Sequence, residues 1–268
     1  MPAPADFHVH TQFSWDAPRG SMEGNCRQAL SIGLTAIAFT EHADFPPSPH
    51  RGRRDLNLAG YLAELERCRT LFPDLRIMSG IELGEPHRHE EMTRDLLQAG
   101  GFERRLGSAH CAEVDGQLLD GSQVGRLRPD QAPDFMRAYF RESLDLAGSD
   151  APFEILTHID YPKRYWPHGR VPFRETDYEG EYRAVLRALA ARDGVLEVNT
   201  TRGAAPEVGL CPNQPVLGWW VEEGGRAISL GSDAHEPAGI GRGFAHAEEL
   251  ITALGFRPPT EAMGFWLR

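Results

Sequence analysis

The sequence predicts an α/β fold built on a parallel sheet or barrel, and two observations predict it. Seven short, apolar, β-rich runs recur along the chain, and each ends in polar residues. Segments with a helical period lie between them. Continuous apolar runs are typical of strands buried on both faces, and alternation with helices indicates right-handed strand–helix–strand units. Because one pattern repeats along the chain, we expect a single domain that spans residues 1–268.

The strands are expected, in chain order, at 6–10, 34–42, 75–82, 104–110, 153–160, 194–200 and 226–233. Residues 61–72 place Tyr61, Leu65 and Cys68 on one helical face. Residues 182–194 repeat this helical pattern and end at a glycine, which commonly terminates helices. Long loops are expected at 43–60, 111–130 and 160–180. Each follows a polar strand end, where α/β barrels place their binding loops.

The composition argues against several classes of function. The 268 residues include 28 Lys+Arg and 39 Asp+Glu, a net charge of −11, which disfavours nucleic-acid and membrane partners because phosphate surfaces demand clustered positive charge. Four scattered cysteines without a CxxC pair indicate neither a zinc ribbon nor a disulfide framework. Without a signal-peptide pattern or a run of ~18 apolar residues, a cytoplasmic protein is expected. The sequence does not indicate an oligomeric state.

Side chains with metal-binding chemistry gather at the predicted strand ends. His8 and His10 are two residues apart in a strand, so both imidazoles project to the same face. A single histidine at a strand end is better explained as a core residue whose ring nitrogens are hydrogen-bonded. Six at successive strand ends, together with carboxylates, would face large desolvation and repulsion costs unless cations held them. The complete set is His8, His10, Asp16, His42, Glu82, His110, His158, Asp233 and His235.

The chemistry of this set favours particular metals. Imidazoles mixed with carboxylates, without a thiolate, suit Zn²⁺, Fe²⁺ or Mn²⁺, whereas an all-oxygen set would suit Mg²⁺ or Ca²⁺. Nine groups exceed what one tetrahedral ion needs. With one bridging carboxylate they suffice for two or three ions.

Six motifs together resemble a known family, the polymerase-and-histidinol-phosphatase (PHP) phosphoesterases. They are DFHVHTQFSWDA, FTEHAD, GIELGE, GSAH, THIDY and LGSDAH, in the family's order over residues 6–235. The resemblance implies a distorted seven-stranded (β/α)7 barrel, similar to a TIM barrel, with a trinuclear metal centre at the carboxyl ends of the strands.

The resemblance also implies a distribution of ligands. The first metal would take His8, His10, Glu82 and Asp233. Glu82 would bridge to the second metal, which His110 and His158 complete, and Asp16, His42 and His235 would hold the third. Glu82, Asp233 and His42 are the residues expected to act most directly in catalysis, and either Asp233 or metal-bound water could protonate the leaving group.

A metal centre of this kind can hydrolyse phosphate monoesters, since a water that bridges two cations becomes a hydroxide near neutral pH and can attack phosphorus in line. Lys163 and Arg164 follow the ligand His158, and Arg202 follows the next predicted strand. The segments resemble those of the histidinol-phosphatase branch, in which arginines at both places bind the phosphate. One departure is an extra residue in the second motif, which reads NTTR instead of NTR.

The leading expectation is therefore hydrolysis of L-histidinol phosphate, a late step of histidine biosynthesis. A close alternative is another small phosphate ester of the family, such as a nucleotide or sugar phosphate. An amidohydrolase is a further alternative, but that class often binds its metals through a carboxylated lysine at a strand end. Lys163, the only lysine, does not end a strand, which argues against it. A metal-binding scaffold would not need an open multinuclear site, and an exonuclease conflicts with the net charge. Acidic residues that could contact a cationic leaving group are Glu113, Asp115 and Asp120, although such loop residues are more often solvated.

Overall fold

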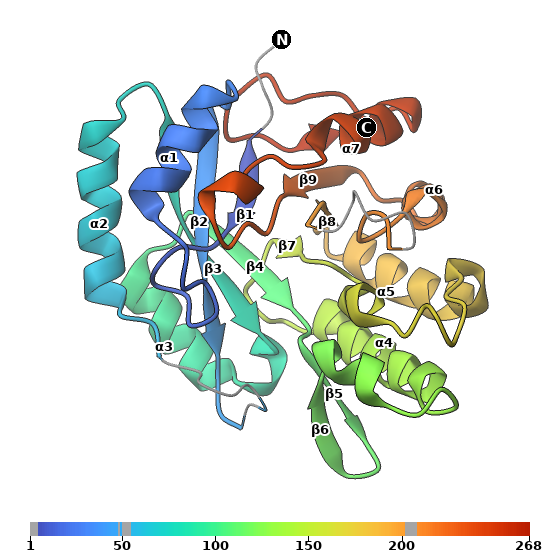
Figure 1. Cartoon of the computed structure of the whole chain (residues 1–268). Coiled ribbons are helices and arrows are strands. Elements are labelled where there is room, and N and C mark those ends of the chain that lie inside the picture. Colours follow the sequence, from blue (N-terminus) through green and yellow to red (C-terminus); the bar gives the residue numbers. More distant parts are fainter. Residues whose placement is uncertain (1–4, 48, 50–54, 202–207) are drawn as a thin grey trace.

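The structure is a computed structural model that describes residues 5–47, 49, 55–201 and 208–268. Its main sheet has eight strands, of which the first seven are parallel (Figure 1). In sheet order they are β1 (Asp6–Val9), β2 (Ala36–Asp44), β3 (Arg76–Gly84), β4 (Arg104–Ser108), β7 (Ile155–Leu156), β8 (Val195–Asn199), β9 (Ala227–Gly231) and β10 (Trp266–Leu267). All seven predicted strands are confirmed, and the fold is the expected curled, barrel-like α/β fold.

The curled sheet closes only near the carboxyl ends of its strands. The backbone N–H of His10 donates to the carbonyl of Ala234 at 2.9 Å, and the N–H of Asp233 donates to the carbonyl of His8 at 2.7 Å. At its other end β9 pairs instead with the antiparallel β10. This partial closure is the distortion of the barrel, and it places the end of β1 beside the chain that leaves β9.

Helices cover the outside of the sheet (Figure 1). They are α1 (Met22–Ser31), α2 (Leu58–Leu71), α3 (Glu90–Gly100), α4 (Ala132–Gly148), α5 (Glu179–Ala191), α6 (Gln214–Glu222) and α7 (Phe244–Ala253). The predicted helices at 61–72 and 182–194 are confirmed as α2 and α5. Tyr61, Leu65 and Cys68 of α2 are buried in the core, as their spacing predicts. None of the helices in the described part of the chain is long and apolar enough to cross a membrane.

The predicted loop at 111–130 contains regular structure. Within 111–130, β5 (Cys111–Val114) and β6 (Gln117–Asp120) form an antiparallel hairpin, and a short 3₁₀ helix (Gly121–Arg126) follows. The two turn residues, Asp115 and Gly116, both have positive φ, 52° and 74°. An Asp-Gly pair is the turn that a two-residue hairpin favours.

Candidate metal centre

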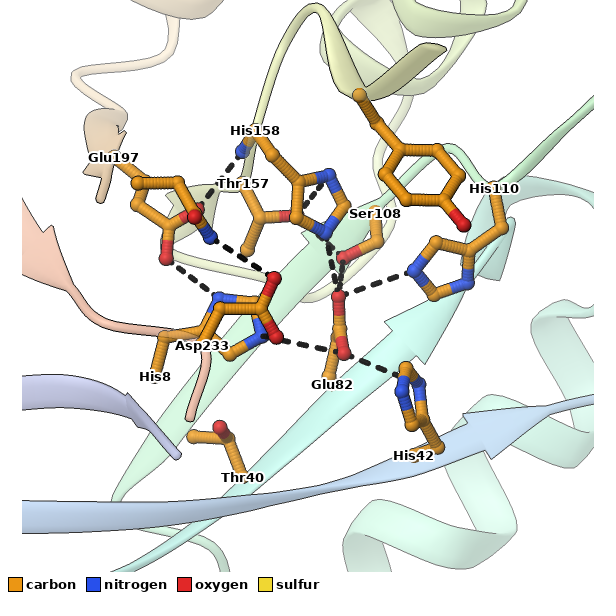
Figure 2. A network of polar contacts seen from close by, with 12 residues as sticks. His8, Thr40, His42, Glu82, Ser108, His110, Thr157, His158, Glu197 and Asp233 are labelled. Atoms are coloured by element: carbon orange, nitrogen blue, oxygen red, sulfur yellow. Dashed lines mark hydrogen bonds and ion pairs between the residues drawn. The ribbon is translucent and has the colours of Figure 1, made fainter. Parts of the chain in front are cut away.

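The carboxyl ends of the parallel strands bring all nine predicted ligand groups to one place. β1, β2 and β3 carry His8, His42 and Glu82, and Figure 2 shows these side chains pointing toward one another. The others lie in the segments that follow a strand: His10, Asp16, His110, His158, Asp233 and His235. Because parallel strands end at the same edge, residues far apart in the sequence converge there.

Glu82 lies at the centre of the cluster, and its carboxylate contacts five imidazoles. Its Oε1 is 2.9 Å from Nε2 of His158 and 3.1 Å from Nε2 of His110. Its Oε2 is within 3.3 Å of a ring nitrogen of three more histidines, His8, His10 and His42. Each oxygen faces a different group of imidazoles, which is the arrangement that a bridging carboxylate needs.

Two aspartates close the other side of the cluster. Asp233 Oδ1 lies 3.2 Å from Nε2 of His10. Asp16 Oδ2 lies 2.9 Å from Nε2 of His235 and 3.4 Å from Nε2 of His42. The His42 ring therefore lies between Asp16 and the central carboxylate.

Several buried atoms of the cluster have no hydrogen-bond partner in the part of the chain that the structure describes. They include Glu82 Oε2, His42 Nδ1 and Asp16 Oδ1. Four sets of three groups have ligand atoms within 4.8 Å of one another. Buried polar atoms are costly without a partner. Nitrogen and carboxylate oxygen atoms crowded in this way fit divalent transition-metal ions.

Two further carboxylates orient ligand histidines from behind. Nδ1 of His8 lies 2.6 Å from Glu197 Oε1, and Nδ1 of His110 lies 2.7 Å from Asp44 Oδ1. Because a carboxylate accepts, each Nδ1 donates, so in the neutral ring, which is the form that binds a metal, Nε2 presents its lone pair to the cluster. Such carboxylate–histidine pairs are usual around protein-bound metals. Sequence reasoning missed both carboxylates, although a glutamate inside the buried run LEVN is an unusual feature.

The ionisation of the cluster suits cations. Burial opposes the charged forms of Glu82 and Asp233, but nearby His8 and, for Asp233, also Arg164 outweigh it and hold both carboxyl pKa values well below their usual range. Burial and the neighbouring imidazoles lower the pKa of His10 to about 3. At neutral pH the two carboxyls are therefore ionised and His10 is neutral, as metal ligands must be.

Arg164 is the basic residue that the structure places beside the cluster. It is buried in a 3₁₀ helix (Tyr161–Tyr165), and its Nη1 donates to Asp233 Oδ2 at 2.7 Å. Its Nε and Nη2 are buried without a hydrogen-bond partner among the described residues. Arg164 also lines the cavity above the cluster. A guanidinium with two unpartnered nitrogens beside such a cavity can bind an oxyanion.

Lys163 does not occupy the position expected of a phosphate-binding residue. Its Nζ lies 2.8 Å from Asp160 Oδ2 and donates to the carbonyl of Leu210 at 2.6 Å, and it is 1% exposed. These contacts hold the ammonium of Lys163 within the protein, because a buried charge must be paired. Arg202 lies outside the described residues.

The cavity above the cluster has a volume of about 190 Å³. Its outer lining includes Trp15, Asp120, Ser122, Tyr161 and Tyr165. Asp120 is 3% exposed, and its Oδ1 accepts from the N–H of Ser122 at 2.7 Å and from the hydroxyl of Tyr161 at 3.4 Å. Of the three acidic residues considered for the leaving group, Asp120 alone lines this cavity, because the strand β6 turns it inward.

The remaining acidic and histidine candidates lie elsewhere. Glu113 and Asp115, on the β5–β6 hairpin, are exposed. His87 Nε2 lies 2.9 Å from Glu142 Oε1 of α4. His87 forms a second HxH pair with His89 in the sequence, but it contributes to this helix contact rather than to the metal cluster.

Comparison with known proteins agrees with the fold and the site. The PHP domain family model matches residues 6–201, and the chain belongs to this family. A histidinol-phosphatase of Lactococcus lactis is 27% identical over 255 residues, which cover 94% of this chain and 91% of that protein. A probable histidinol-phosphatase of Clostridium acetobutylicum is 28% identical over 260 residues, 94% of each chain.

A solved structure shares the fold over its whole length. It is histidinol phosphate phosphatase from Lactococcus lactis in complex with zinc, L-histidinol and phosphate. The TM-score is 0.81 at 24% identity, and the match covers 98% of each chain. The expected distorted barrel is therefore the fold of a known phosphatase as well as of this chain.

Proposed function

We propose that this chain is a metal-dependent phosphomonoester hydrolase that acts on L-histidinol phosphate. One observation carries the proposal: seven of the nine metal-binding groups line one cavity together with a buried arginine, two of whose nitrogens have no hydrogen-bond partner among the described residues. A cation cluster and a guanidinium both neutralise the charge that phosphoryl transfer develops on the phosphate oxygens. The names of the relatives agree with it, and we place the reaction in the cytoplasm and in a single domain.

Two or three divalent ions, Zn²⁺, Fe²⁺ or Mn²⁺, would occupy the centre. We assign one to His8, His10, Glu82 and Asp233, a second to Glu82, His110 and His158, and a third to Asp16, His42 and His235. When bound, these ions supply an activated water and neutralise charge on the phosphate oxygens. The carboxylate of Glu82 and the ring of His42 contact groups of more than one set, so both hold the sets together.

The residues of the chain provide binding and orientation. The unpartnered Nε and Nη2 of Arg164 would donate to phosphate oxygens, and its contact with Asp233 fixes the direction of the guanidinium. Because Asp233 is held ionised, it is a ligand and an anchor for Arg164 rather than the donor of the proton that the leaving alkoxide needs. The aromatic rings of Trp15 and Tyr161 cover the outer cavity and limit the access of bulk water.

The outer cavity favours a leaving group with positive charge. Asp120 is a buried carboxylate in a lining that otherwise carries aromatic rings and hydroxyls. A carboxylate next to aromatic rings binds ammonium or imidazolium groups. Histidinol carries both an amine and an imidazole, whereas nucleotide and sugar phosphates lack an ammonium group.

The test is the rate of phosphate release by the full-length, metal-loaded protein from a panel of phosphate monoesters. We expect kcat/KM for L-histidinol phosphate to exceed that for nucleotide and sugar phosphates at least about tenfold, which is 1.4 kcal/mol of transition-state binding. A preference for another ester would retain the reaction class and reject this substrate. Absence of any phosphatase activity would reject the proposed function.

A further inference from the structure

Three residues behind His10 form a chain of hydrogen bonds that the proposed reaction does not use. Glu41 of β2 is fully buried, and its carboxylate accepts from the backbone N–H of Thr11 at 3.1 Å and from the Thr11 hydroxyl at 2.6 Å. It also accepts from the hydroxyl of Ser14 at 2.6 Å. Ser14 in turn lies 3.0 Å from Nδ1 of His10. The chain therefore runs from Glu41 through Ser14 to a predicted metal ligand.

The directions of these hydrogen bonds follow from what each atom can do. The Ser14 hydroxyl has one proton and two lone pairs. Its proton goes to the carboxylate of Glu41, and the backbone N–H of His42, which can only donate, takes one lone pair at 3.2 Å. Only the second lone pair is left for His10, so Nδ1 of His10 must be the donor.

The orientation of His10 matters because His8 lies opposite. The two Nε2 atoms are 3.1 Å apart, and in the neutral, metal-binding ring of His8 the lone pair is on Nε2, since Glu197 accepts from its Nδ1. In its other tautomer His10 would donate an Nε2–H to His8. The two imidazoles would then satisfy each other, and neither lone pair would be open to a cation.

We propose that Glu41, acting through Ser14, is a positioning residue that fixes His10 in the Nδ1–H tautomer and so keeps the His8–His10 pair open to metal. This inference rests on the proposed function for the role of His10 as a ligand.

Zinc binding by the full-length protein tests the inference with a readout other than activity. The variant is Ser14→Ala, which removes the acceptor of the His10 Nδ1–H. Ser229→Ala is the matched control, because Ser229 of β9 is also buried and its hydroxyl has no hydrogen-bond partner among the described residues. In competition with a chelator, we expect Ser14→Ala to weaken zinc binding about 10- to 100-fold, and Ser229→Ala to leave it unchanged.

A second measurement does not depend on any variant. In the ¹⁵N-labelled, zinc-loaded protein we expect a slowly exchanging Nδ1–H signal from His10, with Nε2 as the metal-bound nitrogen. Coordination of His10 through Nδ1, or equal zinc affinity of the Ser14→Ala and Ser229→Ala proteins, would overturn the inference. Failure of the proposed function has a different signature: zinc affinity would respond to Ser14→Ala, but no phosphate monoester would be hydrolysed.

Discussion

At the scale of single residues, the charge on Glu82 holds the cluster together, because one carboxylate contacts five imidazoles. Glu82→Gln keeps the shape of this side chain and removes its charge. We therefore expect at least one metal equivalent to be lost and kcat to fall by about 100-fold or more. Elemental analysis and steady-state rates measure both effects. Wild-type metal content and turnover in Glu82→Gln would show that the bridge is assigned to the wrong residue.

Asp120 is the residue whose charge we propose to act in substrate choice, since it lines the cavity. Asp120→Asn removes the charge but retains an oxygen for the N–H of Ser122, so the start of the following 3₁₀ helix is preserved. A hydrogen bond to a charged group contributes about 1.5–3 kcal/mol. We therefore expect kcat/KM for L-histidinol phosphate to fall by about 10- to 100-fold, and that for 4-nitrophenyl phosphate to stay within about twofold.

The control for this prediction is Glu113→Gln, on the same hairpin but exposed to solvent, which should change neither rate. Equal losses for both substrates in Asp120→Asn would indicate damage to the site rather than loss of selection. No loss for either substrate would exclude Asp120 from recognition.

At the scale of elements, the strands that carry the centre leave no space for added atoms. A Cβ on Gly231 of β9 would lie 2.2 Å from Glu197 Oε1 and 2.6 Å from the Cβ of His8. The added methyl group of Gly231→Ala must therefore push His8 away from Glu197, the carboxylate that orients it. We expect a loss of about 1–3 kcal/mol in the free energy of unfolding and weaker zinc binding, measured by urea unfolding and chelator competition.

Gly218→Ala in α6 is the matched control, since an added Cβ there meets no neighbour within 4 Å among the described residues. Replacing a helical glycine by alanine stabilises by about 0.5–1 kcal/mol, so this variant should be slightly more stable than wild type. A Gly231→Ala protein as stable as Gly218→Ala would contradict the tight packing of β9 against His8.

The elements also show what sequence can and cannot predict. The parallel strands were predictable because burial on both faces leaves continuous apolar runs. The β5–β6 hairpin lay within a predicted loop, although Asp115-Gly116 carries the turn signal, and β10, with two residues, is too short to show any period. Glu197 and His8 are 189 residues apart in the chain, so their contact depends on the closure of the barrel, which no local pattern records.

At the scale of the whole molecule, charge has to be considered by region. The net charge of −11 by itself disfavours any anionic partner, including a phosphate ester. Yet the cavity contains the buried guanidinium of Arg164 and the proposed cation sites. With its ions bound, this cavity would attract a phosphate dianion locally, while the acidic surface would still repel nucleic acid.

Removal of the metals should weaken the entire fold, because the ions bind only the folded chain. Ions at 100 times their dissociation constant contribute about 2.7 kcal/mol, and each kcal/mol shifts Tm by about 2–4 °C in a domain of this size class. A chelator should therefore lower Tm by roughly 5–10 °C, and added Zn²⁺ should restore it, as thermal unfolding followed by circular dichroism would measure. The Glu82→Gln protein is the control, since a centre without its bridge has less binding energy to lose and its Tm should respond less. If the wild-type Tm were the same with and without chelator, the buried imidazoles and carboxylates would have to be stable by themselves, and the centre would not be a metal site.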